Sequence, residues 1–322
     1  MRAAILDDYQ RVALSVADWA SLAGQVEVQA FSDVLPDIDA AAARLQDFEI
    51  VVAMRERTPF PKALIERLPR LKLIVTTGHR NAAIDVAAAS ARGVTVCGTE
   101  MLGYPTAELT WGLILSLVRR IPWEAESMRR TGWQGGDPGS LGTGVNGKTL
   151  GLLGLGKLGG QVAAVGRAFG MTVIAWSQNL TAEKAAAAGA ARVEKAELLR
   201  RADVVSIHLV LGDRTRGLVG AADLALMKPT AYLVNTSRGP IVDESALVAA
   251  LKERRIAGAA LDVYDREPLP AEHPLRSLGN ALLTPHLGYV TAENYRLAYG
   301  QAVDGIRAYL AGKPLRAIGA AG

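Results

Sequence analysis

Three side chains that could do chemistry follow short apolar segments late in the chain. Arg238 follows the segment AYLVN, Glu267 lies in GAALDVYDREPLP, and His286 comes two residues after ALLT. A histidine exchanges protons near neutral pH, a carboxylate can orient it, and an arginine can hold a carbonyl or carboxylate group. Together these types suit carbonyl reduction, whereas each alone could be a turn-capping Arg, a surface Glu or a structural His.

A glycine-rich turn precedes them in the segment GLLGLGKLGG, residues 151–160. Its G-x-G-x-x-G pattern follows an expected strand and precedes an expected helix over Gln161–Phe169, the context that favours a dinucleotide site over a plain turn. The glycines allow a tight turn, close approach of a pyrophosphate and close helix–strand packing. The residues expected to contact the cofactor here are Gly154, Gly156, Lys157, Leu158 and Gly159.

The cofactor's ribose should lie at the end of the next strand, where dinucleotide-binding folds often place an acidic residue about 20 positions on. This chain has Ser177, Gln178 and Asn179 there, and none is a carboxylate. Because no negative charge there would repel a 2′-phosphate, the sequence slightly favours NADP over NAD. No arginine follows to bind that phosphate, so NAD or NADP stays open, and these residues could also be ordinary loop chemistry.

Elements that would position these residues alternate along the chain. Apolar, β-branched runs typical of buried strands alternate with alanine-rich helical segments, which favours parallel sheets with helices on both faces. One α/β series ends near residue 101 and a second ends near residue 287. A long helix is expected from Pro105 to Arg120, then a polar, glycine-rich stretch over 131–148, and a final helix over 291–311.

Composition excludes several other classes of protein. The 322 residues are 50% hydrophobic, and 36 Lys+Arg against 32 Asp+Glu give a net charge of +4 without a long basic stripe. Nucleic-acid binding is therefore not expected, although the sign favours small anionic ligands. The single Cys97 and four dispersed histidines predict no disulfide and no metal site. The absence of a signal or membrane-spanning segment predicts a cytoplasmic protein that does not bind membranes.

Four sequence segments, in this order, resemble the D-isomer-specific 2-hydroxyacid dehydrogenase family: GLGKLG, VNTSRGPIVDESALVAAL, GAALDVYDREPLP and LLTPHLGYVT. The resemblance covers nearly the whole chain. It implies hydride exchange between NAD(P)H and a small 2-oxo acid or D-2-hydroxy acid that is glyoxylate-, hydroxypyruvate- or pyruvate-like. In that case His286 would be the general acid/base, Glu267 its partner, and Arg238 the group that holds the substrate.

The same resemblance implies further contacts. The substrate carboxylate would meet backbone N–H groups of the loop Thr77, Gly78, His79 and Arg80, besides Arg238 and His286. Asp262 would meet the nicotinamide amide, and His208, Thr236 and Gly288 are also expected beside the cofactor, although His208 could be structural and His273 a solvated loop residue.

The chain departs from the family at a few positions. Ala82 and Ala83 replace an acidic-and-amide stretch, and Val210 replaces a proline. Arg80 would suit a second acidic group on the substrate or would be a solvated loop residue.

Two Rossmann-like or flavodoxin-like domains are expected, each with a parallel sheet flanked by helices, and with a cleft between them. Residues 1–101 and 288–322 would form the substrate-binding domain, and residues 102–287 the NAD(P)-binding Rossmann domain. By resemblance the protein would be a homodimer, with the helix after Pro105 contributing to the interface.

Two other functions remain possible on the sequence. An NAD(H)-sensing binding protein of the corepressor type would share the fold and these residues without significant turnover. A serine hydrolase is suggested by the segment Asn235–Gly239 and by the order Ser237, Asp262, His286, although the first glycine of a nucleophile elbow is replaced by Asn235.

Overall fold

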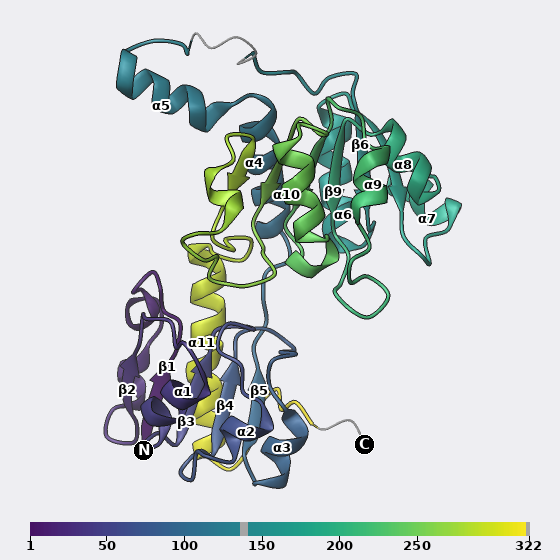
Figure 1. Ribbon diagram of the computed structural model, residues 1–322. Helices are drawn as coiled ribbons and strands as arrows, with labels where there is room; N and C mark the ends of the chain where they lie inside the picture. Colours follow the sequence, from purple (N-terminus) through teal and green to yellow (C-terminus); the bar gives the residue numbers. More distant parts are fainter. Residues whose placement is uncertain (136–140, 320–322) are drawn as a thin grey trace. The chain divides into compact units, whose positions relative to one another are not determined.

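The computed structural model describes residues 1–135 and 141–319, which divide into two compact units (Figure 1). Unit 1 comprises Met1–Leu102 and Val290–Gly322, and unit 2 comprises Gly103–Tyr289. The breaks differ by one and two residues from the boundaries expected at 101/102 and 287/288. The expected domain ranges also include residues 136–140 and 320–322, which lie outside the described residues.

Unit 1 contains a five-stranded parallel sheet in the order β2-β1-β3-β4-β5, which is the flavodoxin-like order. Every residue of β3 and β4 is buried, as expected for strands covered on both faces. The elements are β1 Arg2–Ile5, β2 Glu27–Ala30, α1 Ile38–Leu45, β3 Ile50–Ala53, α2 Lys62–Ile65, β4 Leu73–Thr76, α3 Val86–Ala91 and β5 Thr95–Gly98.

The C-terminal helix α11, Ala292–Leu310, completes unit 1 by packing against β4. Thr291 caps its first turn by accepting a hydrogen bond from the Asn294 N–H group. Tyr299, Ala302 and Ile306 form part of its buried face, while other positions are exposed, so the helix is amphipathic. No helix within 1–135 and 141–319 is long and apolar enough to cross a membrane.

Unit 2 contains a seven-stranded parallel sheet in the order β12-β11-β10-β9-β6-β7-β8. The two sheets confirm the predicted α/β fold class. The chain runs outward in both directions from β6 and β9, so these neighbours form the switch point at which dinucleotides bind in such sheets. The strands are β6 Thr149–Leu153, β7 Thr172–Trp176, β8 Ala191–Arg192, β9 Val204–Ile207, β10 Tyr232–Asn235, β11 Gly258–Leu261 and β12 Ala281–Leu283.

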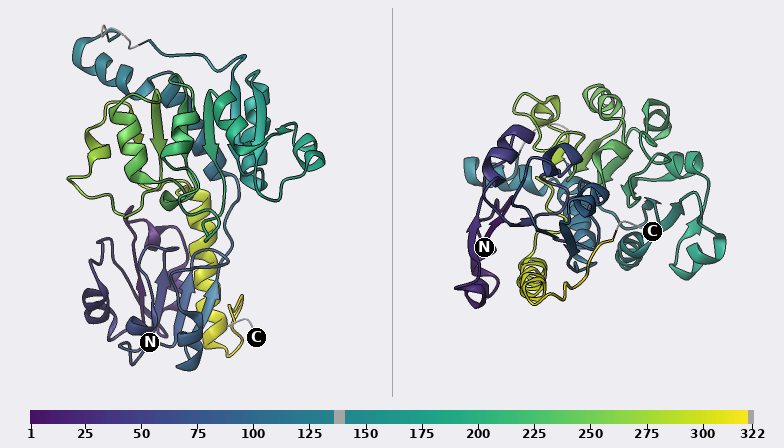
Figure 2. Two further views of the ribbon diagram at one scale, coloured as in Figure 1. Left: turned by 45° about the vertical axis from the view of Figure 1, so that its right-hand side comes forward. Right: turned by 90° about the horizontal axis from the view of Figure 1, so that it is seen from below.

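Helices cover both faces of this sheet (Figure 2). Alternate strand residues point to opposite faces, so Leu153 and Leu233 join one apolar core while Leu152 and Val234 join the other. Helices α8, α9 and α10 contribute to the first core, and α4 and α6 contribute to the second. The helices are α4 Pro105–Val118, α5 Ile121–Thr131, α6 Lys157–Ala168, α7 Ala182–Ala187, α8 Lys195–Arg201, α9 Ala221–Leu226 and α10 Glu244–Lys252.

Helix boundaries differ from the expectation in two places. Helix α6 begins at Lys157 rather than Gln161, because Gly159 and Gly160 are helical despite the low helix propensity of glycine. The helix from Pro105 ends at Val118, and Arg120 adopts a left-handed backbone (φ +57°) that separates it from α5. No helix was expected over α5, which ends where Gly132 adopts φ +79°.

Candidate active site

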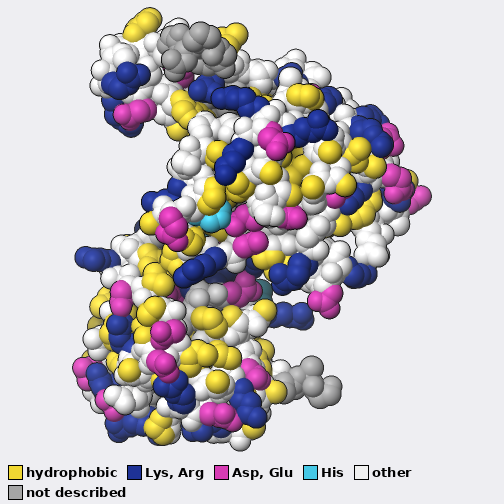
Figure 3. All heavy atoms as spheres, viewed as in Figure 1, with side chains coloured by type: hydrophobic (Ala, Val, Ile, Leu, Met, Phe, Trp, Pro, Cys, Tyr) yellow, Lys and Arg dark blue, Asp and Glu magenta, His cyan; other side chains and the backbone are white. Residues whose placement is uncertain are grey.

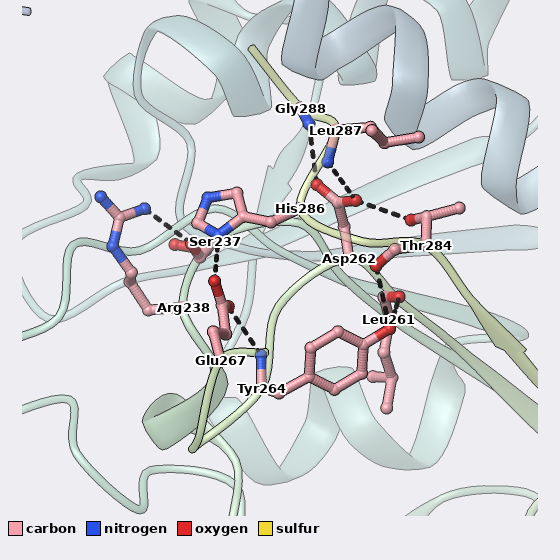
Figure 4. Close-up of polar contacts among 10 residues, drawn as sticks. All are labelled: Ser237, Arg238, Leu261, Asp262, Tyr264, Glu267, Thr284, His286, Leu287 and Gly288. Atoms are coloured by element: carbon pink, nitrogen blue, oxygen red, sulfur yellow. Dashed lines mark hydrogen bonds and ion pairs between the residues drawn. The ribbon is translucent and has the colours of Figure 1, made fainter. Parts of the chain in front are cut away.

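Arg238, Glu267 and His286 all follow neighbouring strands of unit 2. Strand β11 pairs in parallel with β10 on one side and β12 on the other, so the loops after these strands leave the same edge of the sheet. The structure therefore brings together the loops that carry the three residues predicted from the sequence (Figure 4).

His286 and Glu267 form a close pair. The Nδ1 atom of His286 lies 2.6 Å from Oε2 of Glu267, and the two side chains are 17% and 24% exposed. The other carboxylate oxygen of Glu267, Oε1, accepts a hydrogen bond of 3.0 Å from the backbone N–H of Tyr264. Since both oxygens of Glu267 are engaged, the carboxylate holds the imidazole in one orientation (Figure 4).

The backbone of His286 is in the left-handed region with φ +55°, where a residue other than glycine costs free energy. Its N–H donates to the Thr284 carbonyl oxygen at 3.0 Å, which closes a tight turn immediately after β12. Because this backbone conformation costs free energy, neighbouring groups must stabilise the turn.

Asp262 supplies that stabilisation from the end of β11. Its fully buried carboxylate accepts hydrogen bonds from the Thr284 hydroxyl at 2.6 Å, the Leu287 N–H at 2.7 Å and the Gly288 N–H at 2.8 Å. Burial raises the pKa of Asp262 above its ordinary value, while the hydrogen bonds act in the opposite direction. These contacts make Asp262 the support of the His286 loop, and its expected contact with the nicotinamide amide stays a prediction.

Arg238 lies in a loop held by Asn235, the last residue of β10. The Asn235 side chain accepts a hydrogen bond from the Ser237 N–H at 3.0 Å and donates one to the Arg238 carbonyl at 2.9 Å. The partly buried Arg238 guanidinium donates to the Ser237 carbonyl at 2.8 Å. A Cβ on Gly239 would lie 2.1 Å from the Tyr264 carbonyl carbon, so only glycine lets these two loops touch.

Tyr264 is a supporting residue that the sequence did not single out. Its buried hydroxyl lies 3.0 Å from the Leu261 carbonyl and 2.9 Å from the Thr284 carbonyl, so it ties the ends of β11 and β12 together. Burial, together with the carboxylates of Asp262 and Glu267, raises the pKa of this phenol, which keeps it a neutral donor. In the sequence, the only indication of this role is that Tyr264 comes two residues after Asp262 at the end of an expected strand.

The glycine turn after β6 is tightly packed on one side. Gly154 has φ +101°, and a Cβ there would lie 2.5 Å from the His208 carbonyl oxygen. A Cβ on Gly159 would lie 2.2 Å from the Gly154 carbonyl oxygen. Both positions therefore require glycine, as the sequence pattern predicts for a turn at the switch point.

The same turn is open at Gly156, where a Cβ would meet no atom within 4 Å. Helix α6 begins immediately afterwards at Lys157, and the N–H groups of its first turn have no acceptor within the helix. This combination of open backbone and helix N-terminus fits the pyrophosphate of a dinucleotide.

The turn after β7, which was expected at the ribose, has a cation beside it. The Leu180 N–H donates to the Ser177 carbonyl at 3.1 Å, and Gln178 and Asn179 between them are exposed. Arg192 of β8 donates from Nε to the Leu180 carbonyl at 2.9 Å and pairs with Glu194 at 2.9 Å. Arg192 lies on the neighbouring strand β8 and not directly after β7, where the sequence pattern would place an arginine for the 2′-phosphate.

His208 lies directly after β9, at the switch point. Its Nε2 lies 2.9 Å from the Ser206 hydroxyl, and desolvation lowers the pKa of His208 to about 4. The ring is therefore neutral at pH 7 and suits a packing role beside the glycine turn.

Two other residues expected at the cofactor have partners within unit 2. The Thr236 hydroxyl lies 2.8 Å from the Thr110 hydroxyl. The Gly288 N–H donates to Asp262, and its carbonyl accepts a hydrogen bond of 2.8 Å from the Thr106 hydroxyl.

The loop expected to bind the substrate carboxylate follows β4 in unit 1. The Thr77 N–H donates to the Ala53 carbonyl at 3.0 Å, and the Gly78 N–H donates to the Thr99 hydroxyl at 2.9 Å. His79 and Arg80 are exposed. The N–H groups of Thr77 and Gly78 therefore hold the loop, of which His79 and Arg80 are the exposed residues.

Asn81 braces this loop and was not singled out in the sequence. Its buried side-chain amide donates to the Thr76 hydroxyl at 2.9 Å and to the Arg55 carbonyl, and its oxygen accepts from the Ala83 N–H at 2.9 Å. An asparagine with both ends of its amide engaged fixes a loop conformation.

The contacts of the serine-hydrolase candidates do not form a triad. His286 pairs with Glu267 rather than Asp262, whose oxygens accept from the loop after β12. The Ser237 hydroxyl donates to the Leu209 carbonyl. The geometry thus favours the dehydrogenase assignment of these residues.

A second His–Glu pair lies outside this loop cluster. Nε2 of His273 lies 3.0 Å from Oε1 of Glu244, so His273 is paired rather than solvated as the sequence suggested. Within the described residues, no group of three or more His, Cys, Asp or Glu side chains could hold a metal ion. Lys and Arg side chains are interspersed with Asp and Glu on the face in Figure 3.

Comparisons with known proteins identify the family. The model for the NAD-binding domain of D-isomer specific 2-hydroxyacid dehydrogenases matches residues 111–288. The chain is 42% identical over 260 residues to a glyoxylate reductase of Aeropyrum pernix, covering 78% of this chain and 76% of that protein. It therefore belongs to the D-isomer-specific 2-hydroxyacid dehydrogenase family. It is an NAD(P)-dependent oxidoreductase.

Two further proteins are similar to this chain over most of its length. The chain is 37% identical over 272 residues to a D-3-phosphoglycerate dehydrogenase of Methanocaldococcus jannaschii, covering 84% of this chain and only 51% of that protein. A crystal structure of a phosphoglycerate oxidoreductase from Vibrio cholerae is 39% identical, with a TM-score of 0.92 over 97% of this chain and 99% of that chain.

The neutral state of His208 predicts a specific dependence of stability on acid. The folded pKa of about 4 lies below the ordinary value of 6.5, so between these values the unfolded chain binds a proton that the folded chain does not. This residue's contribution, about 3 kcal/mol at most, is present above pH 6.5 and is lost as the pH falls toward 4. His208→Gln should remove that dependence in urea unfolding followed by circular dichroism.

Parallel curves for His208→Gln and the parent protein between pH 7 and pH 4 would contradict the assignment of a neutral, desolvated His208.

Proposed function

We propose that this protein reduces a small 2-oxo acid to a D-2-hydroxy acid, or catalyses the reverse oxidation, through Arg238, Glu267 and His286. The observation that carries the proposal is the 2.6 Å pair of His286 and Glu267 on loops that leave the same sheet edge as the Arg238 loop. The glyoxylate reductase relative supports a 2-oxo acid of that size as substrate.

The proposed chemistry follows from which nitrogen Glu267 engages. The carboxylate accepts the Nδ1–H of His286, so the proton to be exchanged is on Nε2, at the far side of the ring. His286 would donate that proton to the substrate's carbonyl oxygen in reduction and take it from the hydroxyl in oxidation. Arg238 would bind the 2-oxo group and carboxylate through its planar set of donors. Bound NAD(P)H supplies the hydride.

Residues of the glycine turn would hold the cofactor. The open backbone at Gly156 and the first turn of α6, with Lys157 and Leu158, would bind the pyrophosphate, while Gly154 and Gly159 set the shape of the turn. His208, Thr236 and Gly288 would border the nicotinamide side through packing and backbone rather than through free polar groups.

NADP is the preferred cofactor in this proposal. Ser177, Gln178 and Asn179 present no carboxylate to a 2′-phosphate, and the Arg192 guanidinium bonds to the same turn at Leu180. A cation next to the ribose position favours a phosphate there.

The loop after β4 would bind the substrate carboxylate. The exposed His79 and Arg80 would contribute their N–H groups, and the positive charge of Arg80 would favour an anionic substrate. Thr77 and Gly78 would fix the loop through their bonds to Ala53 and Thr99.

A homodimer is proposed on the apolar surface at and beside α5. Ile121 and Met128 on α5 are 50% and 56% exposed, and Trp133, two residues after the helix, is 71% exposed. Large apolar side chains that are exposed close together in the chain are typical of an interface. The buried face of α4, from which α5 continues, anchors this helix to unit 2.

The first prediction from the proposed function concerns activity. Purified protein should oxidise NADPH or NADH, followed by absorbance, in the presence of glyoxylate, hydroxypyruvate or pyruvate. His286→Gln should lower kcat by roughly 10²–10⁴-fold, the contribution of a general acid, while NADPH binding measured by fluorescence is retained.

His273→Gln is the matched control, because it breaks the other His–Glu pair of unit 2 and should leave turnover intact. Absence of turnover with every acid and both cofactors, despite cofactor binding, would refute the dehydrogenase proposal and favour a nucleotide-sensing protein. Full turnover by His286→Gln would remove His286 from the mechanism.

The second prediction concerns cofactor choice. Ser177→Asp places a carboxylate at the end of β7 and should lower kcat/KM with NADPH relative to NADH by at least roughly tenfold, because it repels the 2′-phosphate. Thr172→Asp adds the same charge at the exposed opposite end of the strand and should leave the ratio unchanged. An unchanged ratio in Ser177→Asp would place the 2′-position elsewhere.

The third prediction concerns assembly. Met128→Glu should shift the protein from dimer to monomer in sedimentation velocity, because a charge would be buried in an apolar interface. Leu14→Glu, at a residue of unit 1 that is 52% exposed, should leave the dimer intact. A dimer that persists in Met128→Glu would contradict the assigned interface.

A further inference from the structure

The first two turns of α4 contact both loops that carry the proposed catalytic residues. Thr106 and Thr110 lie four residues apart and therefore on one side of the helix. The Thr106 hydroxyl donates to the Gly288 carbonyl at 2.8 Å, and the Thr110 hydroxyl lies 2.8 Å from the Thr236 hydroxyl. Gly288 is two residues after His286, and Thr236 is two residues before Arg238.

Hydrogen-bond directions can be assigned for the buried pair. Thr110 is fully buried and Thr236 is 6% exposed. The single hydroxyl proton of Thr110 is used in a 2.7 Å bond to the Thr106 carbonyl, so the Thr236 hydroxyl donates to Thr110. If Thr110 lost its hydroxyl, the buried Thr236 hydroxyl would lose its acceptor, which carries a free-energy cost.

The Gly288 peptide is held from both sides. Its N–H donates to Asp262 and its carbonyl accepts from Thr106. A Cβ on Gly288 would lie 3.2 Å from the Thr106 hydroxyl and 3.3 Å from the Asp262 carboxylate, so the backbone fits closely between them. Thr106 therefore fixes the end of the turn in which His286 has its left-handed backbone.

Helix α4 is a rigid support for these contacts. Trp111, Ile114 and Leu117 are buried in the apolar core to which α4 and α6 contribute, and the helix packs against β10 and β11. A hydroxyl on such an element holds its partner with little freedom.

We propose that Thr106 and Thr110 are positioning residues, which fix His286 and Arg238 in register through the Gly288 carbonyl and the Thr236 hydroxyl. Neither threonine touches the reacting atoms in this proposal. The proposal rests on the proposed function, because it explains how the two loops that carry His286 and Arg238 are held. Carbonyl reduction requires a proton donor and a carboxylate-binding group at a set separation, and small misplacements lower the rate strongly.

The two threonines should give different kinetic signatures. Thr110→Val keeps the shape of the side chain but releases the loop of Arg238, so KM for the 2-oxo acid should rise roughly tenfold with kcat changed less. Thr106→Val releases the turn of His286, so kcat should fall roughly tenfold with KM within about twofold of the parent value.

Conservative variants and a matched control distinguish a positioning role of the threonines from an effect on folding. Thr110→Ser and Thr106→Ser keep the hydroxyl and should restore the parent kinetics. Thr131→Val removes a hydroxyl that makes the same kind of bond, to the Ser127 carbonyl four residues earlier in α5, and should leave kcat and KM unchanged. Thermal unfolding and NADPH binding are measured for every variant.

The split between kcat and KM, with restoration by serine and with NADPH affinity unchanged, would support the proposal. It is overturned if both valine variants have parent kinetics. It is equally overturned if kcat and NADPH binding fall together in proportion to lost folded protein, which would show a purely structural role. A parent protein that reduces no 2-oxo acid would instead refute the proposed function, so the two failures are distinguishable.

Discussion

A buried carboxylate at the end of β11 is the interaction on which the site depends. Removing an ionised carboxylate from water costs several kcal/mol unless donors replace the water. The Thr284 hydroxyl and the Leu287 and Gly288 N–H groups do so for Asp262, and hydrogen bonds to a charged group contribute about 1.5–3 kcal/mol each. These bonds form only when the turn after β12 closes around the carboxylate, which offsets the left-handed backbone of His286.

The loop after β11 holds the side chain of His286 as well as its backbone. Asp262 holds the turn, Tyr264 reaches the Thr284 carbonyl, and Glu267 orients the His286 imidazole. The Tyr264 N–H also donates to Glu267, so one part of the loop fixes the next. Because Gly239 contacts the Tyr264 backbone directly, the Arg238 loop is tied to the same segment. The loop after β11 therefore holds in place the functional groups that follow β10, β11 and β12.

The sheets could be predicted because buried parallel strands are continuous apolar runs. Arg238, Glu267 and His286 could be predicted because they lie in loops after three such runs, in segments that in this order resemble the family. Their supports could not be predicted. Thr110 and Thr236 are separated by 126 residues, and Thr106 and Gly288 by 182, so only the fold decides which hydroxyl meets which loop. Threonine in a helix is unremarkable locally, as is an arginine such as Arg192 on a two-residue strand.

The two His–Glu pairs of unit 2 show why pairing alone does not define a proton donor. Both histidines are 17% exposed, with contacts of 2.6 Å at His286 and 3.0 Å at His273. In His273 the Nδ1 atom accepts a hydrogen bond of 3.3 Å from the Leu275 N–H and so caps the 3-10 helix Pro274–Ser277, while Nε2 pairs with Glu244 of α10. Glu267 instead engages Nδ1 of His286, and Asp262 holds the backbone that aims the ring. The choice of nitrogen, together with the turn that carries it, distinguishes a histidine suited to exchange a proton from one that caps a helix.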